Sequence, residues 1–159
     1  MKAVVIHYSV FGHTRQIAEA VGERLAAEAE VRVIGIDQLR PADLAGASLV
    51  VMGCPTHRMR LPEAVKPLFE SLPRHLLRGA HVAAFDTSYR MSAFLARFTA
   101  AKTLEGKLRK LGGKRIVPPE TFFIAAREGP LEDDEVARAQ AWADAILDRV
   151  RTGSEGHEK

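Results

Sequence analysis

Short apolar runs alternate with segments of helical periodicity along the whole chain, and this alternation constrains the fold more than any other feature. The apolar runs have strand length and span 2–7, 31–36, 48–53, 81–86 and 115–124. The segments with apolar residues at helical spacing span 14–28, 62–72, 92–111 and 132–151. Strands that alternate with helices form a parallel sheet with helices on both faces. The sequence therefore predicts an α/β fold, a three-layer doubly wound sheet of five parallel strands.

Proline positions qualify some of these elements. Pro62 suits the first turn of its helix, whereas Pro67 lies inside the helix and favours a kink or an early end. Pro118 and Pro119 interrupt the last apolar run, which indicates an edge strand or a bulge. Residues 41–46 are expected to form a short connection with one helical turn.

The chain has 159 residues, the length of one domain, and 47% of them are hydrophobic, which is enough for a packed core. We expect the domain to cover residues 1–151 and the polar residues 152–159 to form a disordered tail. No apolar run is long enough to span a membrane, and the first strand begins without a signal peptide. The single cysteine, Cys54, excludes an internal disulfide. Together these features predict a cytoplasmic protein.

Charge is distributed unevenly along the chain. Residues 58–115 contain 13 Lys/Arg and 4 Asp/Glu, a net charge of +9, whereas the rest of the chain carries −6 and the total is +3. A basic segment can bind nucleic acid, but this one has few interleaved aromatic residues and no nucleic-acid motif. We therefore expect no nucleic-acid partner. No histidine pair has metal-ligand spacing with a third donor, so no metal site is expected.

Ligands of doubly wound sheets bind outside the carboxyl ends of the strands, which points to the loops 8–14, 53–61 and 86–92. In the first loop, hydroxyls at Ser9 and Thr14 flank Gly12, and the loop leads into a helix. Backbone amides and a helix N-terminus can hold a phosphate there without a lysine. The alternative is that Ser9 ends a strand and Thr14 caps a helix.

The other two loops would flank a planar ring beside such a phosphate. Tyr89 is the best candidate to stack on the ring, although it could equally be a surface tyrosine. Phe11 either lines the ring or packs beneath the first loop. Cys54 and Arg60 have the C-x5-R spacing of phosphatases, but Pro55 removes an amide that such a loop needs. We therefore interpret Cys54 as a small buried hydrophobic residue.

These loops resemble those of flavodoxin-like proteins, which bind flavin mononucleotide (FMN). Residues 8–14, YSVFGHT, resemble the phosphate loop of that family, except that Phe11 stands where the family has a hydroxyl. The variant found in flavodoxin-like quinone reductases has an aromatic residue at that position. Cys54-Pro55-Thr56, followed by Leu61-Pro62 and Lys66, resembles their second loop. The third loop lacks their glycines.

The resemblance implies the sheet order 2-1-3-4-5 and an electron-transfer protein with non-covalently bound FMN. The cofactor-binding residues that it implies are Ser9, Val10, Phe11, Gly12, His13, Thr14, Pro55, Thr56, His57, Arg58, Asp86, Thr87, Ser88, Tyr89 and Arg90. Two alternatives stay open: an NAD(P)H:quinone oxidoreductase of the same fold, and a cofactor-free interaction module. Electrons would pass to a redox partner protein, or between a nicotinamide and a small quinone. The oligomeric state stays open.

Three arginines, Arg58, Arg60 and Arg90, fall in the loops predicted to flank the ring. One positive charge about 7 Å from a reduced, negatively charged flavin stabilises it by about 2 kcal/mol at an effective dielectric constant near 20. We therefore expect a less negative reduction potential than in a flavodoxin with an acidic rim, and a preference for anionic partner surfaces.

Overall fold

The structure, a computed structural model, describes residues 1–57, 60–90 and 99–155. Its strands form one parallel sheet and are β1 (Lys2–His7), β2 (Glu30–Gly35), β3 (Leu49–Pro55), β4 (His81–Ser88), β5 (Lys114–Arg115) and β6 (Glu120–Phe123). The strand order is β2-β1-β3-β4-β5, and β6 also pairs with β4. The predicted order 2-1-3-4-5 is confirmed.

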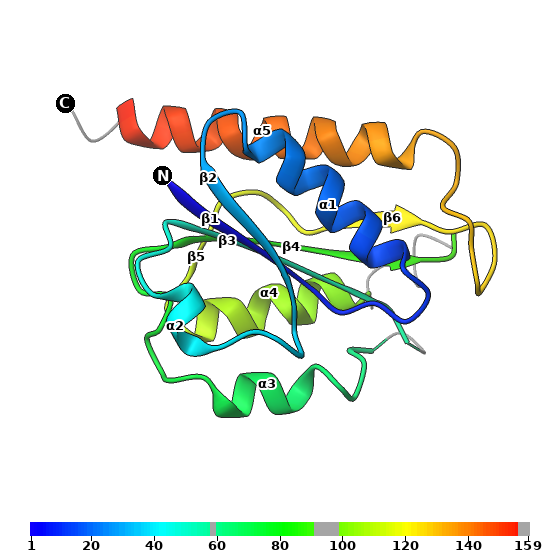
Figure 1. Cartoon of the computed structure of the whole chain (residues 1–159), viewed down its shortest axis with the longest axis horizontal. Helices are drawn as coiled ribbons and strands as arrows, with labels where there is room; N and C mark the ends of the chain where they lie inside the picture. The colour runs from blue at the N-terminus through cyan, green and yellow to red at the C-terminus, as the bar shows by residue number, and fades with distance from the viewer. Residues whose placement is uncertain (58–59, 91–98, 156–159) are drawn as a thin grey trace.

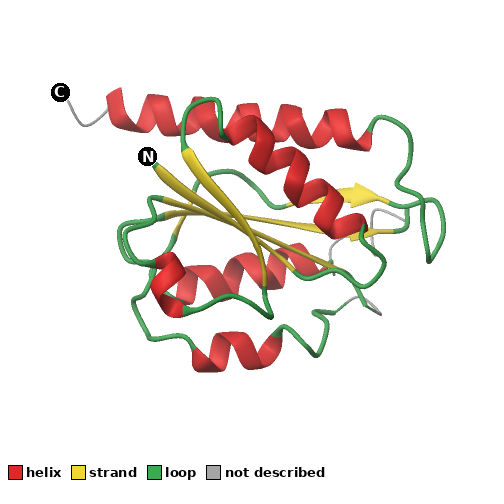
Figure 2. Cartoon of the chain, in the orientation of Figure 1, coloured by secondary structure: helices red, strands yellow, loops and turns green. Residues whose placement is uncertain are grey.

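Helices cover both faces of the sheet, as predicted. They are α1 (His13–Leu25), α2 (Pro41–Leu44), α3 (Lys66–Ser71), α4 (Ala100–Lys110) and α5 (Glu135–Glu155). Helices α1 and α5 lie side by side on one face, and α2, α3 and α4 lie on the other (Figure 1). The loops that leave the carboxyl ends of β1, β3, β4 and β6 gather at one edge of the molecule (Figure 2). Within the described residues, no helix is both long and apolar enough to cross a bilayer.

The core on the α1–α5 side is centred on three aromatic rings. Phe85, Phe122 and Trp142 meet edge to face, with ring centroids 5.8–5.9 Å apart. Gly53 on β3 makes room for this cluster, because a Cβ there would lie 2.0 Å from the Phe85 ring. The rings anchor β4, β6 and α5 to one another, and their rigidity fixes the strand ends that position the site.

Proline accounts for two details of the sheet edge and of α3. The fifth sheet position consists of two segments, β5 and β6, separated by Pro118 and Pro119, so the predicted interruption is confirmed. Helix α3 begins at Lys66, and Pro67 occupies its first turn rather than its interior. A proline is tolerated there because first-turn amides have no intrahelical acceptor. The prediction that the helix begins at Pro62 is therefore wrong.

Two further predicted elements need correction. Helix α4 begins at Ala100, and Thr99 before it is extended, with φ −72° and ψ 155°, so the predicted helix 92–111 does not run through Thr99. Residues 92–98 of that predicted helix lie outside the described part of the chain. Helix α5 extends to Glu155, so residues 152–155 are helical and not part of a disordered tail. The remaining tail residues, 156–159, are outside the described part.

Candidate functional site

A cavity of about 500 Å³ opens at the carboxyl ends of β1, β3 and β4. Its walls come from the three loops that the sequence singles out and from a fourth loop after β6. The lining residues are Ser9, Val10, Phe11, His13, Thr14, Pro55, Thr56, His57, Thr87, Ser88, Tyr89, Ile124 and Arg127. Parallel strands bring their carboxyl ends to one edge, which is why segments far apart in sequence meet here.

The first loop delivers the N-terminus of α1 to the cavity. Gly12 is the N-cap residue and has a left-handed backbone with φ 92° and ψ −3°, a conformation that favours glycine. Its amide donates to Ser9 Oγ at 2.9 Å, which closes the loop. The first amides of a helix lack intrahelical acceptors and carry the positive end of the helix dipole. This end of the cavity is therefore suited to an anion.

Thr14 does not cap the helix, so that interpretation is wrong. It lies inside α1, it is 2% exposed, and its Oγ1 lies 2.9 Å from Thr87 Oγ1 on β4. This hydrogen bond ties the start of α1 to the third loop across the floor of the cavity. The two hydroxyls have the capacity for a further hydrogen bond, because each can donate once and accept twice.

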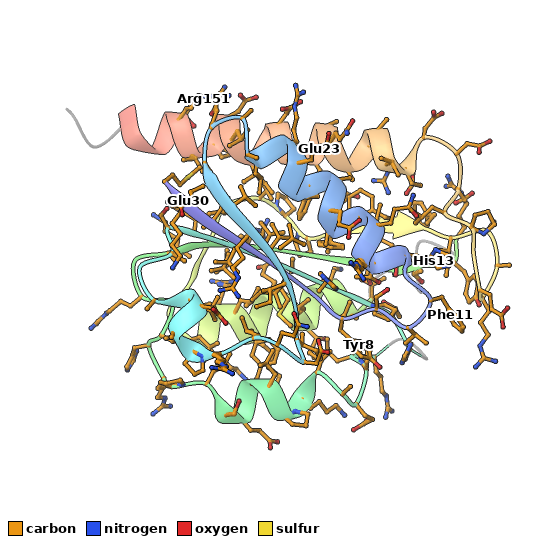
Figure 3. All side chains as sticks on the ribbon, viewed as in Figure 1. Tyr8, Phe11, His13, Glu23, Glu30 and Arg151 are labelled. Atoms are coloured by element: carbon orange, nitrogen blue, oxygen red, sulfur yellow. The ribbon has the colours of Figure 1, made fainter. Side chains whose placement is uncertain are left out.

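Exposed apolar side chains concentrate around this cavity. Val10, Phe11 and Tyr89 are 51%, 48% and 44% exposed, and they are the most exposed large hydrophobic side chains of the described residues, ahead of Met1 and Val33. Figure 3 shows Phe11 projecting from the end of the first loop, away from the core. The alternative in which Phe11 packs beneath the loop is therefore wrong. Side chains of this kind bury their apolar area when a flat ring binds beside them.

The second loop is anchored by a hydrogen bond to the buried carboxyl group of Asp86. Thr56 Oγ1 accepts a hydrogen bond from the backbone amide of Ala100 at 3.0 Å and donates one to Asp86 Oδ2. The Thr56 hydroxyl therefore connects the end of β3 with β4 and with the start of α4. Asp86 is 0% exposed and does not line the cavity, and burial raises the pKa of its carboxyl. Asp86 thus supports the loops from beneath instead of facing a ligand. His57 and Arg60 are joined to each other by two backbone hydrogen bonds.

Sequence reasoning missed the fourth loop, which contributes Ile124 and Arg127. His13 Nε2 lies 2.7 Å from the carbonyl oxygen of Glu128, and the His13 ring packs against Gly129. The side chain of His13, predicted to hold phosphate, is therefore engaged with this loop at the N-terminus of α1. The predicted strand 115–124 could have pointed to this loop, because the fifth strand of a parallel sheet ends at the same edge as the other strands.

The predicted arrangement of three arginines around a ring needs correction. Arg90 pairs with Glu132 at 2.9 Å, and its guanidinium lies 4.4 Å from the centre of the Phe123 ring. Arg60 lines a different hollow, and Arg58 lies outside the described residues. Neither Arg60 nor Arg90 lines the cavity. Among the arginines and lysines of the described residues, Arg127 is the one that lines it.

Cys54 is buried in the core, as predicted. It is 0% exposed, and burial, with a smaller contribution from the nearby Asp86, raises the pKa of its thiol. A thiol in this environment stays protonated and is not a nucleophile. The described residues also hold no cluster of three His, Cys, Asp or Glu side chains that could bind a metal ion.

The residues present fit FMN. The cavity offers the amides at the start of α1 and the cation of Arg127, which suit a phosphate. It also offers the exposed ring of Tyr89, which suits the planar isoalloxazine ring. A cavity of about 500 Å³ falls within the size range of cofactor sites.

Comparison with known proteins agrees with this fit. Residues 5–142 match the flavodoxin family. A flavodoxin from the domain Archaea superimposes with a TM-score of 0.76 at 20% identity, covering 95% of this chain and 99% of that chain. Oxidised flavodoxin 1 from Bacillus cereus superimposes with a TM-score of 0.74 at 20% identity, covering 93% of this chain and 98% of that chain. Rubredoxin oxygen:oxidoreductase from Desulfovibrio gigas matches with a TM-score of 0.74 at 16% identity, covering 95% of this chain but 36% of that chain. The fold, the cavity and the match over residues 5–142 together establish that this chain belongs to the flavodoxin family and is an FMN-binding electron-transfer protein.

Proposed function

We propose that FMN binds in the cavity between the four loops, with its phosphate at the N-terminus of α1 and its ring beside Tyr89. The bound flavin supplies the redox chemistry. The chain binds and orients it: the amides of the first loop and Arg127 hold the phosphate, and Phe11 and Tyr89 shield the ring from water.

The observation that carries this proposal is the clustering of exposed apolar side chains at one helix N-terminus. Folding normally buries a phenylalanine or covers it with neighbours, and an exposed apolar group beside polar loops marks a binding surface. Val10, Phe11 and Tyr89 meet that description around a single cavity. Hydroxyls of Ser9, Thr87 and Ser88 line the same cavity and suit the polar parts of the cofactor.

A titration of the purified protein with FMN and with riboflavin, followed by flavin fluorescence, tests the proposal. We expect FMN to bind with quenched fluorescence and riboflavin to bind at least about a hundredfold more weakly, because riboflavin lacks the phosphate. Val33→Ala, which removes an exposed apolar side chain on β2, serves as a control and should leave both affinities unchanged. Absence of FMN binding would contradict the proposal and favour the cofactor-free module.

We further propose that the protein acts as a carrier in the cytoplasm and serves a redox partner protein with an anionic surface. The match to flavodoxins favours a carrier over an NAD(P)H:quinone oxidoreductase. The net charge of +9 over residues 58–115 supports the sign of the partner surface, because opposite charges accelerate association. The buried, unpaired Cys54 is consistent with a reducing compartment.

A further inference from the structure

A second hollow of about 480 Å³ lies between α3 and α4, on the face of the sheet opposite α1 and α5. We call it the basic groove, and its lining residues are Arg60, Leu61, Lys66, Phe69, Glu70, Thr103, Lys107, Lys110 and Leu111. Four of these are cations contributed by three separate segments, and one is an acid. None of the lining residues belongs to the cofactor cavity.

The floor of the groove is apolar. Leu61 and Leu111 are 5% and 7% exposed, and Phe69 is half-buried against the same core cluster. Helix α3 buries none of its residues fully, so it leaves a gap on the side that faces α4. An apolar floor inside a charged rim is the arrangement found in protein–protein interfaces.

Most cations of the rim are not neutralised by neighbours. Lys66 pairs with Glu63 at 2.8 Å, but within the described part of the chain no acid forms an ion pair with Arg60, Lys107 or Lys110. By contrast, Arg15, Arg24, Arg32, Arg90, Arg109, Arg115, Arg138 and Arg151 each pair with an acidic side chain. The groove therefore presents positive charge that is available to a binding partner.

The groove adjoins the cofactor cavity where His57 and Arg60 meet. His57 lines the cavity, Arg60 lines the groove, and the backbones of these two residues are hydrogen-bonded to each other at 2.8 and 3.0 Å. A protein seated in the groove would consequently reach the rim of the cavity.

We propose that the basic groove is the docking surface for an electron-transfer partner with acidic side chains around an apolar one. Charge complementarity selects this occupant: carboxylates meet Arg60, Lys107 and Lys110, while an apolar side chain covers Phe69. The proposal rests on the proposed function, because it names the surface that the redox partner uses. A small phosphate ligand fits less well, since the four cations are spread over three segments of the chain.

Two forms of one redox protein probe this surface without a known partner. Cytochrome c has a basic surface, and succinylation of its lysines makes the surface acidic while the haem stays the same. Calorimetric titration measures binding of each form, and amide NMR shifts locate it. We expect the succinylated form to bind at low salt, to shift amides of the groove and to lose affinity in 0.5 M NaCl, and the native form to bind at least about tenfold more weakly.

Charge variants then separate the groove from the overall charge. Lys107→Glu/Lys110→Glu should weaken binding of succinylated cytochrome c about tenfold or more, because each reversal replaces an attraction by a repulsion. Glu70→Lys should strengthen it a few-fold. Lys110→Glu alone is compared with Arg149→Glu, an equal charge change on an exposed residue of α5, which should leave binding unchanged.

Equal binding of both forms of cytochrome c, or an equal effect of Arg149→Glu, would overturn the proposal. Two further titrations use citrate, a small anion, and increasing concentrations of the protein itself. If the amide NMR signals of the groove shift only with citrate, the groove binds a small anion and the proposal is overturned. If they shift only with rising protein concentration, the groove mediates self-association and the proposal is likewise overturned. These titrations need no flavin, so a failure here is distinguishable from a failure to bind FMN. The FMN affinity of the groove variants, which we expect to be unchanged, is measured separately.

Discussion

The cofactor cavity and the basic groove adjoin each other at His57 and Arg60, and they present positive charge in different ways. The cavity presents the start of one helix together with Arg127 and exposed aromatic side chains. The groove presents side-chain cations around an apolar floor. Fixed amides suit a compact phosphate in one orientation. Lysine side chains have flexible stems, so they suit a partner surface on which the carboxylates can occupy several positions.

This difference predicts that substitutions in the cavity weaken FMN binding and leave partner binding intact. Substitutions in the groove should weaken partner binding and leave FMN binding intact. The largest effect is expected for Gly12→Val. A β-branched residue is strained at φ 92°, so the first loop relaxes and its amides leave the phosphate. We expect a loss of FMN affinity of about thirtyfold to a hundredfold, measured by fluorescence titration.

Gly106→Ala is the matched glycine control. Gly106 lies in α4, no atom lies within 4 Å of an added Cβ, and its φ is not positive. FMN affinity should not change, and the free energy of unfolding should rise by about 0.5–1 kcal/mol through helix propensity. A similar loss of FMN affinity in both variants would show that Gly12 has no special role.

Tyr89→Ala should weaken FMN and riboflavin alike, because it removes the ring contact and leaves the phosphate contacts in place. Stacking of an aromatic side chain on a flat heterocycle is worth about 1–3 kcal/mol, so we expect a loss of about twentyfold in both affinities. Tyr89→Phe keeps the ring and should keep most of the affinity. If Tyr89→Ala weakens FMN alone, the side chain contacts the phosphate end and the proposed orientation is wrong.

Arg127→Ala should weaken FMN binding by about fivefold and leave riboflavin binding unchanged, because one exposed charge pair contributes about 1 kcal/mol in water. The effect should shrink in 0.5 M NaCl. Arg90→Ala removes an ion-paired arginine outside the cavity and serves as the control. Equal losses for FMN and riboflavin would indicate a structural role for Arg127.

The smallest effect concerns the buried acid beneath the cavity, and it is a pH dependence. Burial raises the pKa of Asp86, so the folded protein holds that proton more tightly than the unfolded chain. The free energy of unfolding therefore falls as pH rises from the ordinary carboxyl pKa through the raised one, by about 1.4 kcal/mol per unit of difference. Asp86→Asn cannot ionise, so its stability relative to the unchanged protein should increase with pH over that window.

Denaturant unfolding at pH 4, 5.5 and 7 measures this dependence. Glu70→Gln neutralises an exposed acid of the groove and should show no comparable trend. A constant stability difference between Asp86→Asn and the unchanged protein at all three pH values would mean that Asp86 is ionised in the folded state as easily as in the unfolded chain.

The sequence predicts the sheet and the cavity well and the side-chain environments poorly. Apolar periodicity sufficed for the alternation of strands and helices and for three of the four loops, because parallel strands must end at one edge. The strand order followed from the resemblance to flavodoxin-like proteins. Whether Arg90 faces a ligand depends on its contact with Glu132, a residue 42 positions away that no local pattern reveals. The same holds for Thr14, whose partner Thr87 is 73 residues away. Arg127 lies in the loop after β6, and no sequence motif marks it as a ligand-binding residue.

An amide NMR spectrum of the ¹⁵N-labelled protein, recorded with and without FMN, tests the central claim most directly. The account predicts large shifts at Gly12, Thr56, Tyr89 and Arg127, which lie in four separate loops, and little change at Lys107 in the groove. Shifts centred on the groove, or no shifts at saturating FMN, would contradict the assignment of the cavity as the cofactor site.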